Sequence, residues 1–246
     1  MTTFILIHGG WCGAWAWNKV VAGLTKKGIK ALAPDLPGHG QNNIENLENV
    51  AMNEYVDYLR DYISRIDGKV VLVAHSMTGF VIAQLVKFIA EKIEKLVFFA
   101  AFMPEKSGDK INDYIAADPH TQVSPKTIVF KTDKLCTFDM RYGRNMGFNL
   151  TSDADFFQAA AQMQLENSVL WGQSVELTPQ YDIIPKFYIH TLKDNCLSYF
   201  AQLRMCAKTP VYKQYYINSS HTAMISFPDE SVEVLADIAA FPLQMM

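Results

Sequence analysis

Short apolar runs alternate with longer segments of helical periodicity along most of this chain. The runs at 4–9, 69–76 and 92–101 are flanked by charges or turn residues, and KVVLVAHS at 69–76 is rich in β-branched residues. An unbroken β-branched run is typical of a strand that is buried on both faces, as in a parallel sheet. Residues 46–66 instead place apolar side chains at helical spacing with charges between them. The alternation predicts an α/β fold whose mostly parallel central sheet has helices on both faces.

The remaining predicted elements continue this alternation up to a change of pattern in the middle of the chain. They are helices at 14–27, 77–90, 198–207 and 229–241, and strands at 29–35, 186–192 and 212–218. From about 104 to 185 the chain holds polar turns and helical stretches rich in aromatic residues and methionine, without a strong strand. We therefore expect an α/β core of residues 1–103 and 186–246, with a helical cap inserted at 104–185.

Composition narrows the class of protein. The chain has 246 residues, half of them apolar and 19% charged, which is typical of one folded α/β domain with an insertion. Its net charge is −3 and the basic residues are scattered, so we expect neither nucleic acid nor a membrane surface as a partner. The longest apolar run, at 96–103, is far shorter than the ~18 residues needed to span a bilayer.

The cysteines and the first residues point to a reducing compartment. Cys12, Cys136, Cys196 and Cys206 are widely spaced and form no CxxC pair, which predicts reduced, mostly buried thiols. The opening MTTFILIHGG has no basic n-region and runs straight into a predicted strand. We expect a cytoplasmic protein, either a monomer or a homodimer.

Polar residues with complementary chemistry follow four of the predicted strands. They are His8 with its following glycines, the pair His75 and Ser76, Asp194, and His221. In an open parallel sheet, ligands bind beyond the carboxyl ends of the strands, so these positions are the ones to examine. A serine hydroxyl is a weak nucleophile that needs a base, and a histidine base needs a carboxylate to orient it. The chain order serine, aspartate, histidine is the one found in α/β-hydrolases.

Six motifs in this order carry a family resemblance: LIHGGWCGAWAW, APDLPGHG, VAHSMTG, FFAAFMP, IHTLKDN and SSHTAMISFPDE. Together they resemble the α/β-hydrolase superfamily, and most of all its methylesterase and hydroxynitrile lyase branch. The resemblance covers essentially the whole chain and is weakest in the insertion. It implies the α/β-hydrolase fold with Ser76 as nucleophile, His221 as base and Asp194 as acid, and an oxyanion hole formed by the amides of Gly10 and Met77. No HxH or HExxH spacing is present, so we expect no metal and no cofactor.

The turn around Ser76 departs from the usual nucleophile elbow. Such turns bring helix and strand together closely, and the residues two before and two after the nucleophile are usually glycine. Here those positions hold Ala74 and Thr78, with Gly79 one place late. An alanine methyl is a small departure. Thr78 is larger and β-branched, so the fit of the helix against the strand at this residue is the question that a structure has to answer.

Other interpretations remain open for the polar residues. Ser76 alone is also compatible with a turn residue or helix cap, and Asp194 with a turn residue. Glu105, the first carboxylate after the strand at 92–101, is the alternative triad acid. Asp35 is interpreted as a carboxylate that fixes its own loop.

The histidines and aromatic residues are less specific. We expect His8 to order the oxyanion loop, and His39, His120 and His190 to have solvent or core roles. Trp11, Trp15 and Trp17 are typical core residues, although Trp11 directly follows the oxyanion loop. The candidates for lining a substrate pocket are Trp11, His75, Met140, Phe148 and Trp171.

These residues together predict a serine ester hydrolase that cleaves small, largely apolar carboxylic esters through an acyl-enzyme, with a small-molecule ester as its partner. Two alternatives use the same residues. Cyanohydrin lyases carry a lysine directly after the base histidine, where this chain has Thr222. Some relatives keep a complete triad and serve as small-ligand receptors with little or no catalysis.

Overall fold

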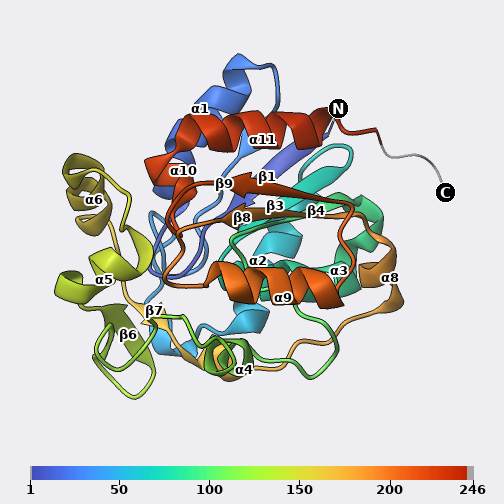
Figure 1. Ribbon diagram of the computed structural model, residues 1–246. Helices are drawn as coiled ribbons and strands as arrows, with labels where there is room; N and C mark the ends of the chain where they lie inside the picture. Colours follow the sequence, from blue (N-terminus) through green and yellow to red (C-terminus); the bar gives the residue numbers. More distant parts are fainter. Residues whose placement is uncertain (1, 243–246) are drawn as a thin grey trace.

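Six parallel strands form the central sheet of the computed structural model, which describes residues 2–242. The strand order is β2-β1-β3-β4-β8-β9, as expected for an α/β protein with crossover helices (Figure 1). The strands are β1 Thr3–Ile7, β2 Ala31–Leu32, β3 Val70–His75, β4 Ile93–Phe99, β8 Lys186–Thr191 and β9 Lys213–Ile217.

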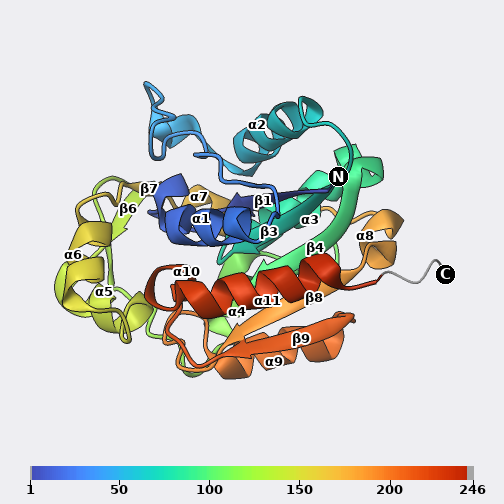
Figure 2. The same cartoon turned by 90° about the horizontal axis from the view of Figure 1, so that it is seen from above.

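Alternate residues of each strand enter two separate cores, one on either side of the sheet. On β3, Val70, Leu72 and Ala74 face one core, and Val71 and Val73 face the other, because successive side chains of a strand point to opposite faces. The first core is covered by α2 Met52–Ser64, α3 Thr78–Ile89 and α9 Tyr199–Lys208, and the second by α1 Asn18–Lys26, α10 Ala223–Ser226 and α11 Pro228–Ala240 (Figures 1 and 2). Among residues 2–242, no helix is both long and apolar enough to cross a membrane.

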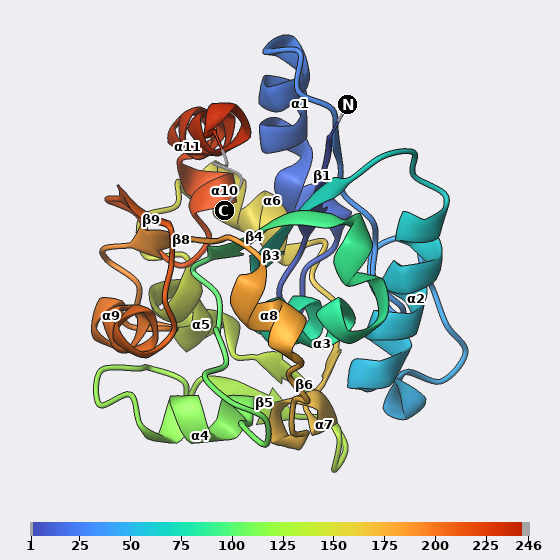
Figure 3. The same cartoon turned by 90° about the vertical axis from the view of Figure 1, so that its right-hand side faces the viewer.

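Residues 111–172 of the segment 104–185 lie at the end of the sheet where the strands finish, whereas Pro179–Ile183 lies at the opposite end, where β8 begins (Figures 1 and 3). The segment contains the predicted short helices: α4 Ile111–Ala116, α5 Met140–Gly147, α6 Asp153–Ala160, α7 Val169–Gly172 and α8 Pro179–Ile183. It also contains a sheet of β5 Ile128–Phe130, β6 Leu135–Phe138 and β7 Glu166–Asn167, paired in that order and antiparallel. The segment was expected to have no strong strand, and it contains these three short ones. The strands are too short for a clear alternation, and Phe130 at the end of the edge strand β5 is 55% exposed.

Three core elements differ in extent from their predictions. The strand expected at 29–35 is reduced to β2, because Pro34 has no N–H to donate to a ladder. The helices expected at 14–27 and 46–66 each begin with a separate 3-10 turn, η1 Ala14–Trp17 and η2 Leu47–Asn49, and another such turn, η3 Ala90–Lys92, follows α3.

Candidate active site

Ser76 occupies a sharp turn between β3 and α3. Its φ is +58°, a left-handed conformation that costs a non-glycine residue roughly 1–2 kcal/mol. The turn is held through the Ser76 carbonyl, which accepts from the N–H of Gly79 at 3.2 Å and of Phe102 at 3.0 Å. Met77, and not Ser76, is the residue that caps α3, so the helix-cap interpretation is wrong. Ser76 is partly exposed between buried neighbours, and its strained backbone is that of a nucleophile elbow.

The close approach of the helix falls at Gly79 and not at Thr78, and it is made to the chain that follows β4. A Cβ atom on Gly79 would lie 2.0 Å from the carbonyl oxygen of Phe102, a distance that no side chain tolerates. Thr78 is fully buried, and its hydroxyl donates to the carbonyl of His75 at 2.8 Å. The threonine therefore fits because its one polar atom is satisfied locally and because the glycine that the turn needs stands one residue later.

Asp194 and His221 form a buried pair beyond the ends of β8 and β9. The Nδ1 atom of His221 lies 2.7 Å from Oδ2 of Asp194. The carboxylate also accepts from the backbone N–H of Cys196 at 2.8 Å and of Leu197 at 2.9 Å, and from the hydroxyl of Thr191 at 2.8 Å. This set of donors holds Asp194 in one orientation, and Asp194 in turn orients the imidazole.

The environment of His221 favours its protonated form. Burial is the largest single influence and lowers the pKa of this histidine, but the charges of Asp194 and Cys196 and the hydrogen bonds to them together raise the pKa well above its usual value. A histidine stabilised as imidazolium is suited to accept a proton during a reaction and to return it later.

The ring of His75 packs against His221. Its Nε2 donates to the backbone carbonyl of His221 at 3.0 Å, and the two ring centres are 4.6 Å apart. Burial, together with the neighbouring charge of His221, lowers the pKa of His75 well below its usual value, so this ring stays neutral. His75 also lines a cavity beside Ser76, so the predicted pocket role and the packing role coexist.

Two backbone N–H groups are free next to the serine. Within residues 2–242, the amides of Gly10 and Met77 have no hydrogen-bond acceptor. The loop that carries Gly10 comes very close to the elbow: a Cβ on Gly9 would lie 2.6 Å from Nδ1 of His75 and 2.8 Å from Cβ of Ser76. Only glycine allows this approach, and unpaired N–H groups at such a position are suited to stabilise an oxyanion.

His8 and Asp35 tie this loop to its neighbours. Nδ1 of His8 donates to the carbonyl of Gly9 at 2.9 Å, and Nε2 accepts from the N–H of Leu36 at 3.1 Å. Burial lowers the pKa of His8 to about 3, so the ring is neutral and can both donate and accept. Asp35 accepts from the N–H of Ala14 at 2.6 Å. Both contacts agree with the ordering roles expected for these two side chains.

Two small cavities of about 30 Å³ each meet at Ser76. We call one the histidine-side cavity; its characteristic residues are Phe138, Met146, Phe148, His221 and Thr222. We call the other the tryptophan-side cavity; its characteristic residues are Phe102, Ile111, Ile115, Val123 and Trp171. Gly10, Trp11, Ser76 and Cys196 line both. The walls are mainly apolar, which suits a small uncharged ligand.

Four of the five predicted pocket residues line these cavities: Trp11, His75, Phe148 and Trp171. The prediction that Met140 lines the pocket is wrong, because this residue lies at the start of α5 and is 42% exposed. Met146 lines the histidine-side cavity instead. It lies six residues after Met140 on the same helix, and this spacing places the two side chains on different helix faces. The sequence did not identify Cys196 and Thr222 as residues that line a cavity. Cys196 lies two residues after Asp194, and Thr222 directly follows His221.

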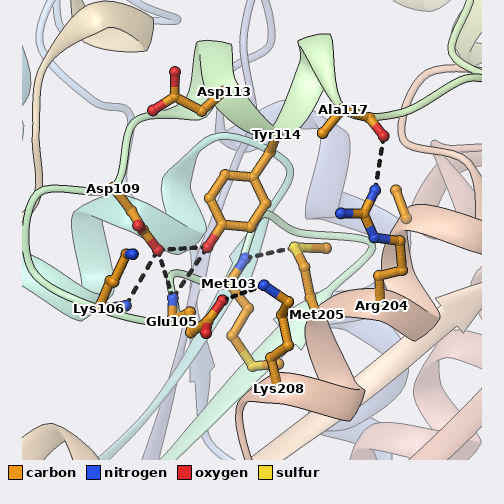
Figure 4. A pocket seen from close by; sticks show the side chains of 11 residues that line it. Met103, Glu105, Lys106, Asp109, Asp113, Tyr114, Ala117, Arg204, Met205 and Lys208 are labelled. Carbon is orange, nitrogen blue, oxygen red and sulfur yellow. Dashed lines mark hydrogen bonds and ion pairs between the residues drawn. The ribbon is translucent and has the colours of Figure 1, made fainter.

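Glu105 lies at a different place on the molecule. It lines a larger surface pocket of about 230 Å³ near α4 and α9, where its carboxylate is paired with Lys208 at 2.7 Å (Figure 4). Tyr114, in the same pocket, donates to the carboxylate of Asp109 at 2.6 Å. Nδ1 of His221 is paired with Asp194. Glu105 is therefore not the carboxylate paired with His221, contrary to the alternative considered from the sequence.

The other histidines, tryptophans and cysteines take mainly structural positions. His190 is buried and its Nε2 lies 2.8 Å from the side-chain oxygen of Gln214, whereas His120 is exposed. Trp17 is fully buried, and Trp15 is partly exposed. All four cysteines are free and three of them are buried.

Comparisons with known proteins agree with this fold. The model of the alpha/beta hydrolase family matches residues 4–234, so the chain belongs to that family. Methylesterase 7 of Arabidopsis thaliana is 29% identical over 248 residues, covering 96% of this chain and 95% of its own. A carbendazim-hydrolysing esterase of Nocardioides is 37% identical over 115 residues, covering 45% of this chain and 46% of its own.

Solved structures and further relatives point the same way. A crystal structure of the Arabidopsis methylesterase MES16 superposes with a TM-score of 0.84 at 21% identity, covering 98% of this chain and 100% of the other. The chain spans 63% and 57% of the length of two relatives named as chloroplastic methylesterases. The resemblance to the methylesterase branch of the α/β-hydrolases is thus confirmed.

Proposed function

We propose that this protein is a carboxylic ester hydrolase that cleaves small, largely apolar esters through an acyl-enzyme. The observation that carries the proposal is the buried pair of His221 and Asp194 at 2.7 Å, of which His221 lines the same apolar cavity as the strained, partly exposed Ser76. The relatives named as methylesterases support ester hydrolysis as the reaction class.

In the proposed reaction, His221 takes the hydroxyl proton of Ser76 while the serine oxygen attacks the ester carbonyl carbon. The carbonyl oxygen becomes an oxyanion, which accepts hydrogen bonds from the amides of Gly10 and Met77. Collapse of the tetrahedral intermediate breaks the bond to the alcohol oxygen, and His221 returns its proton to that oxygen. Water then attacks the acyl-serine in the same way, which releases the acid and restores Ser76. Asp194 orients His221 throughout.

We propose further that segment 104–185 is a cap that sets substrate size. It contributes apolar walls to both cavities, among them Phe148 on the histidine side and Trp171 on the tryptophan side. A volume of about 30 Å³ on each side of the serine favours esters with short groups.

The residue after His221 gives less support to the lyase alternative than to the esterase. Thr222 donates its hydroxyl hydrogen to the carbonyl of Gly147 at 2.9 Å. Among the described residues around Ser76, the two cavities carry no lysine or arginine side chain that would stabilise a cyanide anion. A receptor role, in which ligand binds without turnover, is the remaining alternative and is separated by the same experiment.

Purified protein is assayed against short p-nitrophenyl and methyl esters, with mandelonitrile as the lyase substrate. We expect ester hydrolysis that Ser76→Ala abolishes, and stoichiometric labelling of Ser76 by a phosphonate reagent. Ser64→Ala, which removes an exposed hydroxyl at the end of α2, is the matched control and should keep full activity. No hydrolysis of any ester, or full activity in Ser76→Ala, would overturn the proposal. Cyanide release would favour the lyase.

The predicted compartment and assembly remain predictions. Several relatives are named as chloroplastic, whereas we expect this chain to act in the cytoplasm. Size-exclusion chromatography with light scattering distinguishes the monomer from the homodimer.

A further inference from the structure

A buried carboxylate that the proposed reaction does not use lies beside the oxyanion loop. Glu166, on strand β7 of the segment 104–185, is 0% exposed. Its Oε2 lies 3.3 Å from the amide nitrogen of Trp11 and 3.2 Å from Nε2 of His39. Its Oε1 lies 3.0 Å from the hydroxyl of Tyr55 and 3.1 Å from the amide nitrogen of Asn167. Three hydrogen bonds, from Trp11, Tyr55 and Asn167, and the contact with His39 therefore converge on the two carboxylate oxygens.

The surroundings of Glu166 compensate its negative charge. Burial is the largest single influence and lowers the pKa of His39, but the charge and hydrogen bond of Glu166, with smaller contributions from Pro37 and Asp35, together raise it. Burial, with a smaller contribution from Glu166, raises the pKa of Tyr55 well above its usual value, so its hydroxyl remains a donor. The carboxylate thus has a cationic partner and fixed dipoles, which a buried charge requires in order to persist.

Trp11 is attached to the segment 104–185 at three of its polar atoms. Its N–H donates to Glu166, its carbonyl accepts from the N–H of Gln164 at 3.0 Å, and its indole Nε1 donates to the carbonyl of Cys136 at 3.1 Å. Trp11 itself has a φ of +62°, a left-handed conformation that costs a non-glycine residue roughly 1–2 kcal/mol. The strained residue therefore keeps this conformation because the cap holds it.

Trp11 directly follows Gly10, whose free N–H is one of the two oxyanion donors in the proposed reaction. The two N–H groups lie on the peptide units on either side of the Gly10 Cα, so once the Trp11 N–H is held, only the two backbone dihedrals of Gly10 separate it from the Gly10 N–H. We propose that Glu166 is a positioning residue, which holds the oxyanion loop from the cap and so fixes the Gly10 N–H at the place where the oxyanion develops. The inference rests on the proposed function for the role of Gly10, but the contact between Glu166 and Trp11 is testable without it.

The test variant is Glu166→Gln, which keeps the shape of the side chain. A glutamine has one acceptor oxygen and one NH₂ group, so its NH₂ must face one of the two backbone N–H groups, of Trp11 or of Asn167. We expect kcat on a p-nitrophenyl ester to fall about 100-fold, as for an active-site group misplaced by about 1 Å, with KM changed less than about threefold. The affinity for an apolar boronic acid, which forms a tetrahedral adduct with the serine, should fall by the same factor as kcat/KM.

Glu176→Gln is the matched control, since Glu176 belongs to the same segment but forms an exposed ion pair with Lys87. It should leave kcat, KM and boronate affinity unchanged. Phosphonate titration of active sites separates a slower enzyme from a smaller fraction of folded enzyme. An unchanged kcat per titrated site in Glu166→Gln, or a loss confined to KM, would overturn the proposal.

A second readout does not depend on activity. In protein labelled with ¹⁵N-tryptophan, the amide of Trp11 should exchange slowly in the wild type and faster in Glu166→Gln, whereas the amide of Trp17 should not change. Slow Trp11 exchange in a protein without esterase activity would mean that the proposed function fails while the loop attachment stands. If the variant does not fold, the exchange rate of the Trp11 amide in the wild type still tests the attachment. Exchange at the rate of an unprotected peptide would contradict it.

Discussion

Within residues 2–242, two histidine–carboxylate pairs are buried on both partners. In the first, Nδ1 of His221 lies 2.7 Å from Asp194; in the second, Nε2 of His39 lies 3.2 Å from Glu166. In both pairs, burial lowers the pKa of the histidine, but the carboxylate and smaller neighbouring contributions together raise it. By charge and burial alone, either pair resembles the acid and base of a catalytic triad.

What separates the two pairs is the environment of each histidine. His221 lines the cavity that it shares with Ser76. His39 is enclosed: its remaining nitrogen, Nδ1, lies 3.2 Å from the carbonyl of Pro37 and 3.4 Å from the hydroxyl of Tyr55. A histidine–carboxylate pair with access to a nucleophile and a cavity is suited to proton transfer, and an enclosed one is suited to hold structure.

The largest effect should come from Asp194→Asn. We expect kcat/KM to fall by about 10⁴, because an amide does not hold the imidazole in the correct tautomer. The free energy of unfolding should change little, since the side-chain oxygen of asparagine can still accept from the N–H groups of Cys196 and Leu197. Kinetics and urea unfolding measure the two quantities, with the exposed Asp113→Asn as control. A loss smaller than tenfold would mean that Asp194 is not the acid.

A change in the pair of His39 and Glu166 should instead affect mainly the stability of the fold. His39→Leu leaves Glu166 without its cationic partner, and we expect the free energy of unfolding to fall by about 3–5 kcal/mol. Lys87→Ala, which breaks an exposed ion pair with Glu176, should cost less than about 1 kcal/mol.

This stability difference should depend on pH. The pKa of His39 is raised in the folded protein, so its contribution is complete below the unfolded value of about 6.5 and is lost as the pH rises through the folded-state pKa. Urea unfolding of wild type and His39→Leu at a series of pH values checks the sign. A difference that grows with rising pH would contradict it.

The first pair should appear in the pH dependence of catalysis. His221 must be neutral to accept the serine proton, and its pKa is raised, so the acid limb of kcat/KM should be centred above pH ~6.5. Asp194→Asn should move this limb to lower pH, because the negative charge that raises the pKa is gone. The exposed His120→Gln should leave the limb in place. A wild-type limb below pH ~6.5 would exclude a raised pKa for the base.

The smallest expected effect concerns the elbow. Thr78→Val removes a buried hydroxyl that donates to the carbonyl of His75, and should cost about 1 kcal/mol of unfolding free energy. Thr25→Val removes a similar hydroxyl bond on an exposed helix face and should cost less. Equal costs would mean that the buried bond at Thr78 contributes nothing beyond an exposed one.

Much of the fold was predictable because its signals are local. The β-branched run before Ser76 and the all-round apolar helix after it identify a buried strand and a buried helix by periodicity alone. The strand predicted at 29–35 exists but is reduced to Ala31–Leu32, and the strands of the segment 104–185 were not predicted, since runs of two to four residues carry too little periodicity. The exposed position of Met140 depends on how α5 is rotated, which its own sequence does not state.

By itself, the sequence determined the order of the elements and the chemistry at their ends: a serine after β3, an aspartate after β8 and a histidine after β9. These follow from local patterning, because each strand places its following residue at the same edge of a parallel sheet. Only the tertiary structure decided which carboxylate meets which histidine. It is also the structure that joins Glu166 to Trp11, 155 residues away, and that places the required glycine at Gly79, against a carbonyl of Phe102. Contacts between distant segments depend on packing, and no local pattern encodes them.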